Sequence, residues 1–238
     1  MSSSTSRYAI YFTPHPESAL AVFGARLLGY DPDKGLPVAQ MELSGVDRED
    51  LAAATEAPRR YGFHATIAAP FYLGDGPEEK LIERFRVFCN RTRPAQLGRL
   101  AVTPLDHFVA LTPVTACADV DDLARDCVTF FDSLRAPPSA KDLARRDDGS
   151  LTPRERDYLH RWGYPYVFEE FRFHMSLTGR LSPGDRDRYV SALSEVYQPL
   201  SEGSYELDAL SLLRQDDPES RFRVVIRENL KGANVQSV

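Results

Sequence analysis

Phe63-His64-Ala65-Thr66-Ile67 and Phe173-His174-Met175-Ser176-Leu177 are two stretches of this sequence that repeat one pattern. In each, a histidine follows a phenylalanine and precedes a hydroxyl residue by two positions. The aromatic and aliphatic neighbours favour a β-strand, in which successive side chains point to opposite faces of the sheet. His64 and Thr66 therefore share one face, as do His174 and Ser176, and the apolar residues beside them are expected to face a core.

The segments around the motifs follow the same plan in both halves of the chain. A motif strand is followed by a helix and then a β-hairpin, predicted at 61–73, 78–91 and 97–112 in the first half and at 167–178, 183–197 and 205–228 in the second. Strands and helices without regular strand–helix–strand alternation indicate an α+β fold, with helices packed outside largely antiparallel sheets. We expect one domain, residues 1–238, built from two similar halves.

Other segments are predicted from turn and capping residues. Ser18 is a suitable N-cap and Gly29 a suitable end for a helix. A stretch rich in charged residues precedes the second motif, and this stretch is predicted to form two helices. These segments are a strand at 7–13, helices at 19–28, 47–56 and 120–134, and the charged insert at about 140–163.

Composition limits the classes of function. The 238 residues are 42% hydrophobic and 27% charged, which is typical of a globular protein with a sizeable core. The net charge of −6 argues against binding to duplex nucleic acid, which needs a strongly basic face. The start of the chain is polar and no run of eighteen apolar residues occurs, so we expect a cytoplasmic protein without a membrane span. The three cysteines suggest reduced thiols.

The two motifs together indicate phosphoryl chemistry. One neutral imidazole can take a proton from water while the other, protonated, donates a proton to the leaving oxygen, because histidine titrates near neutral pH. Thr66 and Ser176 can donate hydrogen bonds to the phosphate oxygens. This scheme requires no metal and no cofactor, and the sequence contains no His-Glu-x-x-His or similar metal signature. The expected partner is a small phosphorylated substrate.

These motifs resemble those of the two-histidine phosphoesterases, which include cyclic phosphodiesterases and RNA 2',5'-ligase-like enzymes. The stretches Arg60-Tyr-Gly-Phe-His-Ala-Thr66, Trp162-Gly-Tyr-Pro-Tyr166 and Glu170-Phe-Arg-Phe-His-Met-Ser-Leu-Thr-Gly-Arg180 are similar to a branch associated with phosphonate metabolism. The resemblance implies a bilobal α+β fold whose two sheets face a central groove. It also implies a cyclic phosphodiesterase with His64 and His174 as acid and base, Thr66 and Ser176 as phosphate ligands, and a ribose cyclic phosphate as the preferred substrate.

Several neighbouring residues are weaker candidates. Strand parity puts Arg60 on the face of His64 and Arg172 on the face of His174, so both are candidate phosphate ligands. Tyr8 and Tyr11 stay outside the predicted site because nothing in the sequence decides which way they face. Four aromatic residues, Tyr61, Phe63, Phe171 and Phe173, have the opposite parity and are predicted to be core; His15, His107 and His160 lack the strand pattern and are predicted to be exposed.

Two other functions remain open at this stage. The chain could be a ligase or phosphodiesterase acting on RNA 2' ends, which would need a basic, aromatic-lined groove. It could also be a non-catalytic binder of a phosphorylated metabolite. The sequence leaves open which histidine is the base, and it says nothing about the oligomeric state.

Overall fold

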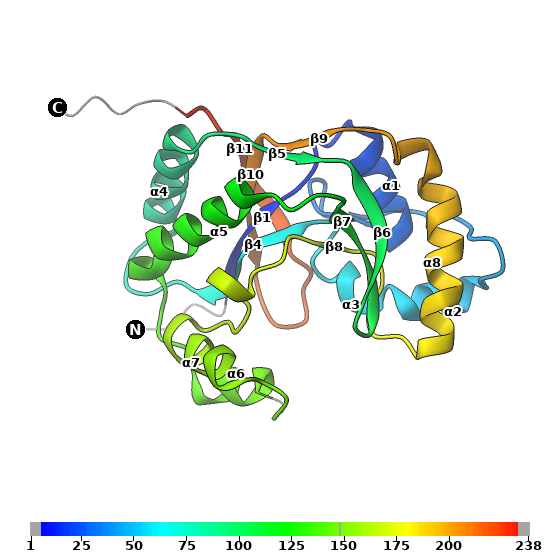
Figure 1. Ribbon diagram of the computed structural model, residues 1–238. Helices are drawn as coiled ribbons and strands as arrows, with labels where there is room; N and C mark the ends of the chain where they lie inside the picture. Colours follow the sequence, from blue (N-terminus) through cyan, green and yellow to red (C-terminus); the bar gives the residue numbers. More distant parts are fainter. Residues whose placement is uncertain (1–5, 148, 233–238) are drawn as a thin grey trace.

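A seven-stranded sheet forms the centre of the structure (Figure 1), a computed structural model that describes residues 6–147 and 149–232. The strand order is β11-β10-β1-β4-β8-β7-β6, and each neighbouring pair runs antiparallel. The strands are β1 (Arg7–Phe12), β4 (Ala65–Tyr72), β6 (Leu100–Leu105), β7 (Phe108–Pro113), β8 (Met175–Ser176), β10 (Ala209–Gln215) and β11 (Arg223–Asn229).

Four long helices cover one face of this sheet. They are α1 (Ala19–Leu28), α4 (Glu78–Arg91), α5 (Ala118–Phe131) and α8 (Pro183–Tyr197). Their apolar residues join one large core with the inward residues of β1, β4 and β8, among them Ile10, Ile67 and Met175. The Ser18 side chain caps α1 by accepting a hydrogen bond from the Ala21 amide, and α1 ends at Gly29 in a left-handed conformation, as predicted.

The other face of the sheet carries a smaller apolar cluster, and the charged insert contacts the chain near the end of β4. Tyr11 and Ala9 pack there with Leu213 and Phe222. Helices α6 (Ala140–Arg146) and α7 (Pro153–Trp162) form the predicted two-piece insert and lie together at the bottom of Figure 1. The remaining short elements are α2 (Arg48–Ala54), α3 (Glu56–Arg59), three 3-10 turns (Asp132–Leu134, Phe168–Glu170, Gln198–Leu200) and the strand pairs β2–β3 (Tyr30–Asp31, Leu36–Pro37) and β5–β9 (Ala95–Gly98, Tyr205–Leu207).

The predicted α+β class is confirmed, with a large antiparallel sheet and helices outside it. The resemblance implied two sheets that face a groove. In the structure the two motifs lie in one sheet, because β4 and β8 are hydrogen-bonded neighbours in its middle. No helix of the described part of the chain is both long enough and apolar enough to cross a membrane.

The predicted strand at 167–178 is wrong over most of its length. Only Met175–Ser176 is β-strand, and Phe168–Glu170 forms a 3-10 turn that begins with Phe168 at a φ of 56°. β8 pairs with β4 at a single position, Ala65 with Met175. The apolar side chains before the motif favour a strand in the sequence. A strand also needs a hydrogen-bonded neighbour, and this segment does not pair with β4.

Candidate active site

The pairing of the two motif strands brings the four predicted residues together. Ala65 lies opposite Met175 in an antiparallel pair. Because the strands run in opposite directions, this register places His64 beside Ser176 and Thr66 beside His174. Each hydroxyl residue is therefore next to the histidine of the other motif, in an arrangement with approximate two-fold symmetry.

Burial follows the strand alternation on both motifs. Ala65 and Met175 are completely buried in the large core, and Phe63 and Phe173 are buried as predicted. His64, Thr66, His174 and Ser176 are all half-buried. The two imidazoles and the two hydroxyls thus share the face of the sheet that the long helices leave open.

Each imidazole is held by the backbone of its own strand. His64 Nδ1 lies 2.8 Å from the carbonyl oxygen of Gly62, and His174 Nδ1 lies 2.8 Å from that of Arg172. A carbonyl oxygen only accepts, so Nδ1 carries the proton in both rings and Nε2 keeps a lone pair. His64 Nε2 lies 3.3 Å from the Thr66 hydroxyl. The two histidines therefore present the same nitrogen in the same tautomer.

Aromatic rings surround His64 more tightly than His174. The Tyr11 ring stacks on the His64 ring with 3.9 Å between centroids, and the Tyr61 ring lies 5.9 Å away. His174 has the Phe108 ring at 5.6 Å. The pKa of His64 is lowered to about 4, chiefly by burial and to a smaller extent by the nearby His174, while the bond to the Gly62 carbonyl acts in the opposite direction. Burial also lowers the pKa of His174. Both imidazoles are thus neutral at pH 7 without substrate.

A cavity of about 620 Å³ opens where β4 and the chain before β8 diverge; we call it the motif cavity. Thr66, His174 and Arg172 line it together with aromatic side chains from β7 and from the chain between α7 and β8. Those aromatic residues are Phe108, Tyr164, Tyr166, Phe168 and Phe171. The loss of strand pairing before Met175 is therefore what makes room for a ligand beside the two motifs.

The two arginine candidates lie in different places. Arg172 is exposed and lines the motif cavity, on the side of His174 that strand parity predicted. Glu170, two residues before Arg172, forms an ion pair with Arg154 at 2.6 Å.

Arg60 lines a separate surface hollow, with Arg59, Arg180 and Arg221. Parity failed for Arg60 because this residue ends α3 in a helical conformation, and Gly62 with a φ of 76° separates it from the strand. The alternation that holds from Phe63 onward does not extend back to Arg60.

Tyr61 and Tyr11, two tyrosines near His64, lie where the sequence did not predict them. Tyr61 was predicted to be core, yet it is half-buried and lies beside His64 and against Phe222. The left-handed Gly62 turns the chain, so that strand parity does not apply to Tyr61 either. Tyr11 had been left out, and it is cross-strand from Thr66 in the β1–β4 pair. Only that pairing reveals which way Tyr11 faces.

The three other histidines, His15, His107 and His160, are exposed as predicted. Within residues 6–147 and 149–232, no three side chains of the types His, Cys, Asp and Glu lie together in a way that could hold a metal ion.

Two curated proteins are similar to nearly the whole chain. One is named ribose 1,5-bisphosphate phosphokinase PhnN, from Janthinobacterium sp. (strain Marseille); it is 39% identical over 233 residues, which are 93% of this chain and 50% of that protein. The other carries the same name, from Laribacter hongkongensis (strain HLHK9), with 33% identity over 225 residues, 92% of this chain and 50% of that protein. The chain spans about half the length of these curated relatives.

Solved structures also match, at low identity. A structure described as a phosphoesterase has a TM-score of 0.42 and 14% identity, and covers 95% of this chain and 98% of its own. E. coli LigT complexed with 3'-AMP has a TM-score of 0.39 and 13% identity, with 94% and 97% covered.

One family model matches residues 66–223, which is more than half of the chain. Its description is "Protein of unknown function (DUF1045)". The matched segment begins at Thr66 in the first motif and includes the whole second motif. This chain belongs to the DUF1045 family.

Proposed function

We propose that this protein is a metal-independent phosphoesterase that hydrolyses a cyclic phosphodiester, with His64 and His174 as its acid–base pair. The observation that carries the proposal is the Ala65–Met175 register, because it sets two half-buried imidazoles and two hydroxyls side by side on one open face. Each imidazole has Nδ1 anchored to a backbone oxygen, which leaves Nε2 for proton transfer.

In this mechanism the phosphorus lies between the two imidazoles. One Nε2 takes a proton from water as the water oxygen attacks phosphorus, and the other, protonated, imidazole gives a proton to the ester oxygen that leaves. The ring opens to a phosphate monoester and a free hydroxyl. Thr66 and Ser176 donate hydrogen bonds to the non-bridging oxygens, each from beside the opposite histidine, and so hold the phosphate in line.

We assign the base to His64 and the acid to His174. Burial keeps the His64 imidazole, on which the Tyr11 ring stacks, neutral down to about pH 4, which suits a group that must accept a proton. His174 lines the motif cavity, where an anionic substrate would raise its pKa and favour the protonated form. Arg172 lines the same cavity, and its guanidinium is proposed to contact the phosphate or the leaving group.

The preferred substrate is a small cyclic phosphate of a ribose or nucleotide, in phosphonate breakdown. The motif cavity of about 620 Å³ is within the ordinary range for small-molecule sites, roughly 300–1,000 Å³. The curated relatives are named for an enzyme that acts on a ribose bisphosphate, which supports a phosphorylated ribose as the substrate class. The cavity volume and the names of the relatives both favour a small molecule over an RNA end as the substrate.

The experiment is a hydrolysis assay in EDTA with 2',3'-cyclic nucleotides and ribose 1,2-cyclic phosphate. His64→Ala and His174→Ala should each lower kcat by roughly 10²- to 10⁴-fold, the usual contribution of a general acid or base. The matched control is His160→Ala, which removes an exposed histidine from α7 and should leave kcat unchanged.

Four results would contradict the proposal. Activity lost in EDTA and restored by a metal ion would refute the metal-independent mechanism. Full activity in either motif variant would show that the substituted histidine is neither the acid nor the base. Tight binding of a cyclic phosphate without turnover by the wild-type chain would favour the non-catalytic binder, and turnover of RNA ends alone would favour the RNA enzyme.

A further inference from the structure

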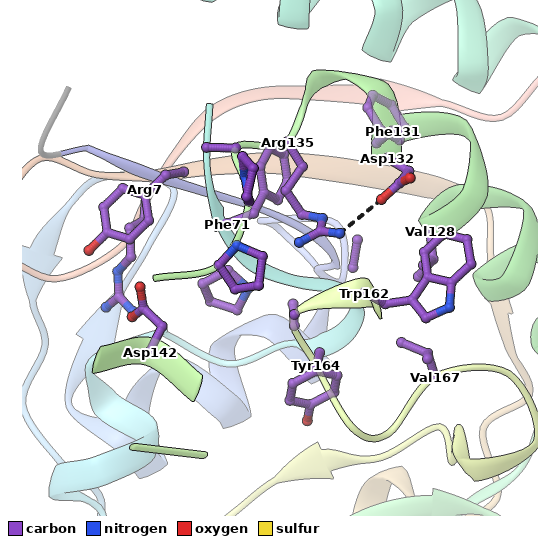
Figure 2. Close-up of a pocket in the computed structure, with 18 of the residues that line it drawn as sticks. Arg7, Phe71, Val128, Phe131, Asp132, Arg135, Asp142, Trp162, Tyr164 and Val167 are labelled. Atoms are coloured by element: carbon purple, nitrogen blue, oxygen red, sulfur yellow. Dashed lines mark hydrogen bonds and ion pairs between the residues drawn. The ribbon is translucent and has the colours of Figure 1, made fainter. Parts of the chain in front are cut away.

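A second, smaller cavity lies next to the motif cavity and is lined by several arginines (Figure 2). We call it the arginine cavity. Its volume is about 60 Å³, enough for one small group, since a water molecule takes up about 30 Å³ in the liquid. The two cavities share the side chains of Ala69, Val128, Tyr164 and Val167, so they are adjacent.

Charge in the arginine cavity is unbalanced. Four arginines line it against two aspartates: Arg7, Arg135, Arg145, Arg146, Asp132 and Asp142. Both aspartates are already in ion pairs. Asp132 pairs with Arg135 at 2.9 Å, as Figure 2 shows, and with Arg161 at 3.0 Å; Asp142 pairs with Arg145 at 3.1 Å.

Arg7 and Arg146 are the two cations left over. Arg7 is only 6% exposed, and its guanidinium donates to the neutral Gln215 side chain, with 2.8 Å from Nε to Oε1. Arg146 donates to the carbonyl oxygens of Gly163 and of Pro70. Within residues 6–147 and 149–232 neither guanidinium forms an ion pair with a carboxylate.

Buried cations in proteins are normally paired, because removing an unpaired charge from water is costly. Burial lowers the pKa of Arg146, which reflects this cost. An anion placed between the two guanidiniums would compensate both charges, and each guanidinium has five N–H donors, more than its protein partners use.

The arginine cavity is also close to the two-histidine centre. Arg7 and Arg146 both lie near enough to Tyr11 to lower its pKa, against the effect of burial. Tyr11 in turn stacks on His64. The Arg146 guanidinium lies over the Tyr164 ring, 5.3 Å from its centroid, and Tyr164 is part of the wall between the two cavities.

We propose that Arg7 and Arg146 form a second anion subsite, which holds a phosphate group that the substrate carries apart from its cyclic phosphodiester. The proposal rests on the proposed function, because it assumes that the cyclic phosphate is bound at the two motifs. It makes the preferred substrate a small cyclic phosphate with an additional phosphate monoester. Arg146, contributed by the insert, then determines specificity without touching the reacting atoms.

Binding is measured first, by calorimetry with ribose 5-phosphate and, for comparison, ribose. Ribose 5-phosphate should bind the wild-type chain, and ribose should bind at least tenfold more weakly. Arg146→Met should weaken ribose 5-phosphate at least tenfold, as expected for the loss of an arginine–phosphate contact. The matched control is Lys141→Met, which removes an exposed charge from the same helix and should change the affinity less than twofold.

Turnover is measured second, with a nucleoside 2',3'-cyclic phosphate that does or does not carry a 5'-phosphate. The wild-type chain should have the higher kcat/KM for the 5'-phosphorylated compound, and Arg146→Met should remove that preference while keeping kcat/KM for the other compound within about threefold. Arg146→Lys, which keeps the charge, should retain part of the preference.

Failure of the subsite and failure of the proposed function give different results. If ribose 5-phosphate binds the wild-type chain no better than ribose, the subsite is refuted. This comparison uses the wild-type chain alone and does not depend on whether a variant folds. It is also refuted if Thr66→Ala abolishes this binding and Arg146→Met leaves it unchanged. If neither cyclic phosphate is hydrolysed while ribose 5-phosphate binding depends on Arg146, the proposed function is wrong and the anion subsite stands.

Discussion

At the residue scale, the two histidines are equivalent in sequence and unequal in environment. Each has a hydroxyl residue two positions later and a backbone carbonyl two positions earlier that accepts from Nδ1. Only His64 is covered by a stacked tyrosine, and only His174 lines the motif cavity. This difference in surroundings, and not the motif itself, is why we propose His64 as the base and His174 as the acid.

The pH dependence of kcat/KM tests this assignment. His64 can act as a base only while neutral, above a pKa of about 4. His174 can act as an acid only while protonated, below a pKa that lies under its ordinary 6.5. We therefore expect a bell-shaped profile with its maximum between pH 4 and 6.5 and a fall as pH rises through 7. A profile that is flat from pH 4 to 8 would rule out this pair of roles.

Tyr11 is expected to control the pKa of His64. Tyr11→Leu removes the stacked ring and admits water, so the pKa of His64 should rise from about 4 toward 6.5 and the acid limb of the profile should move to higher pH. Tyr11→Phe keeps the ring and should leave that pKa in place. NMR titration of the His64 ring protons measures both. Equal pKa values in the two variants would show that the stack has no such effect.

At the element scale, the turn between α3 and β4 positions the first motif. Gly62 there has a φ of 76°, and a Cβ on it would lie 2.6 Å from Cγ of Pro32. Its carbonyl oxygen is also the partner of His64 Nδ1. A glycine is therefore required at this position for two reasons, a left-handed backbone and close contact with Pro32.

Gly62→Ala should destabilise the protein and impair catalysis together. The left-handed backbone alone costs about 1–2 kcal/mol for an alanine, and the contact with Pro32 adds to it. Urea unfolding should show this loss, and kcat should fall because the His64 anchor moves. Gly184→Ala is the control: it lies in the first turn of α8 with open space around it, and should be neutral or slightly stabilising. Unchanged kcat in Gly62→Ala would mean that the anchor does not position His64.

At the scale of the whole molecule, the large core joins residues from both halves of the chain across the sheet. It includes Ile10 and Ile67 from the first half and Met175 and Leu210 from the second. Helices α4 and α5 pack against it through Cys89 and Cys127, both buried. The halves are therefore expected to unfold together.

Thiol reactivity tests this burial. Burial raises the pKa of Cys89 to about 12 and that of Cys127 well above its ordinary value, so neither supplies thiolate at pH 8. A thiol reagent should modify only the half-exposed Cys117 in the native protein, and slowly, because burial and nearby Asp121 and Asp119 raise its pKa too. All three thiols should react in guanidinium. Rapid labelling of Cys127 in native buffer would contradict the buried interface between helices and sheet.

The α+β class, most helices and the shared face of the four motif residues could be predicted from the sequence alone. Local signals were sufficient for these features, because strand alternation shows which side chains share a face and capping residues mark helix ends. His64, Thr66, His174 and Ser176 are on one face in the structure, as the motif pattern predicts.

The motif cavity and the residues around it depend on how distant parts of the chain pack together. The segment before Met175 leaves the sheet because it lacks a strand partner, and the motif cavity opens in its place. Tyr11 and Arg7 reach the site through pairing across strands, and Arg146 reaches it through the folding of the insert. These contacts join residues more than fifty positions apart, and the sequence near each residue contains no signal for them, because cross-strand pairing and packing depend on the whole chain.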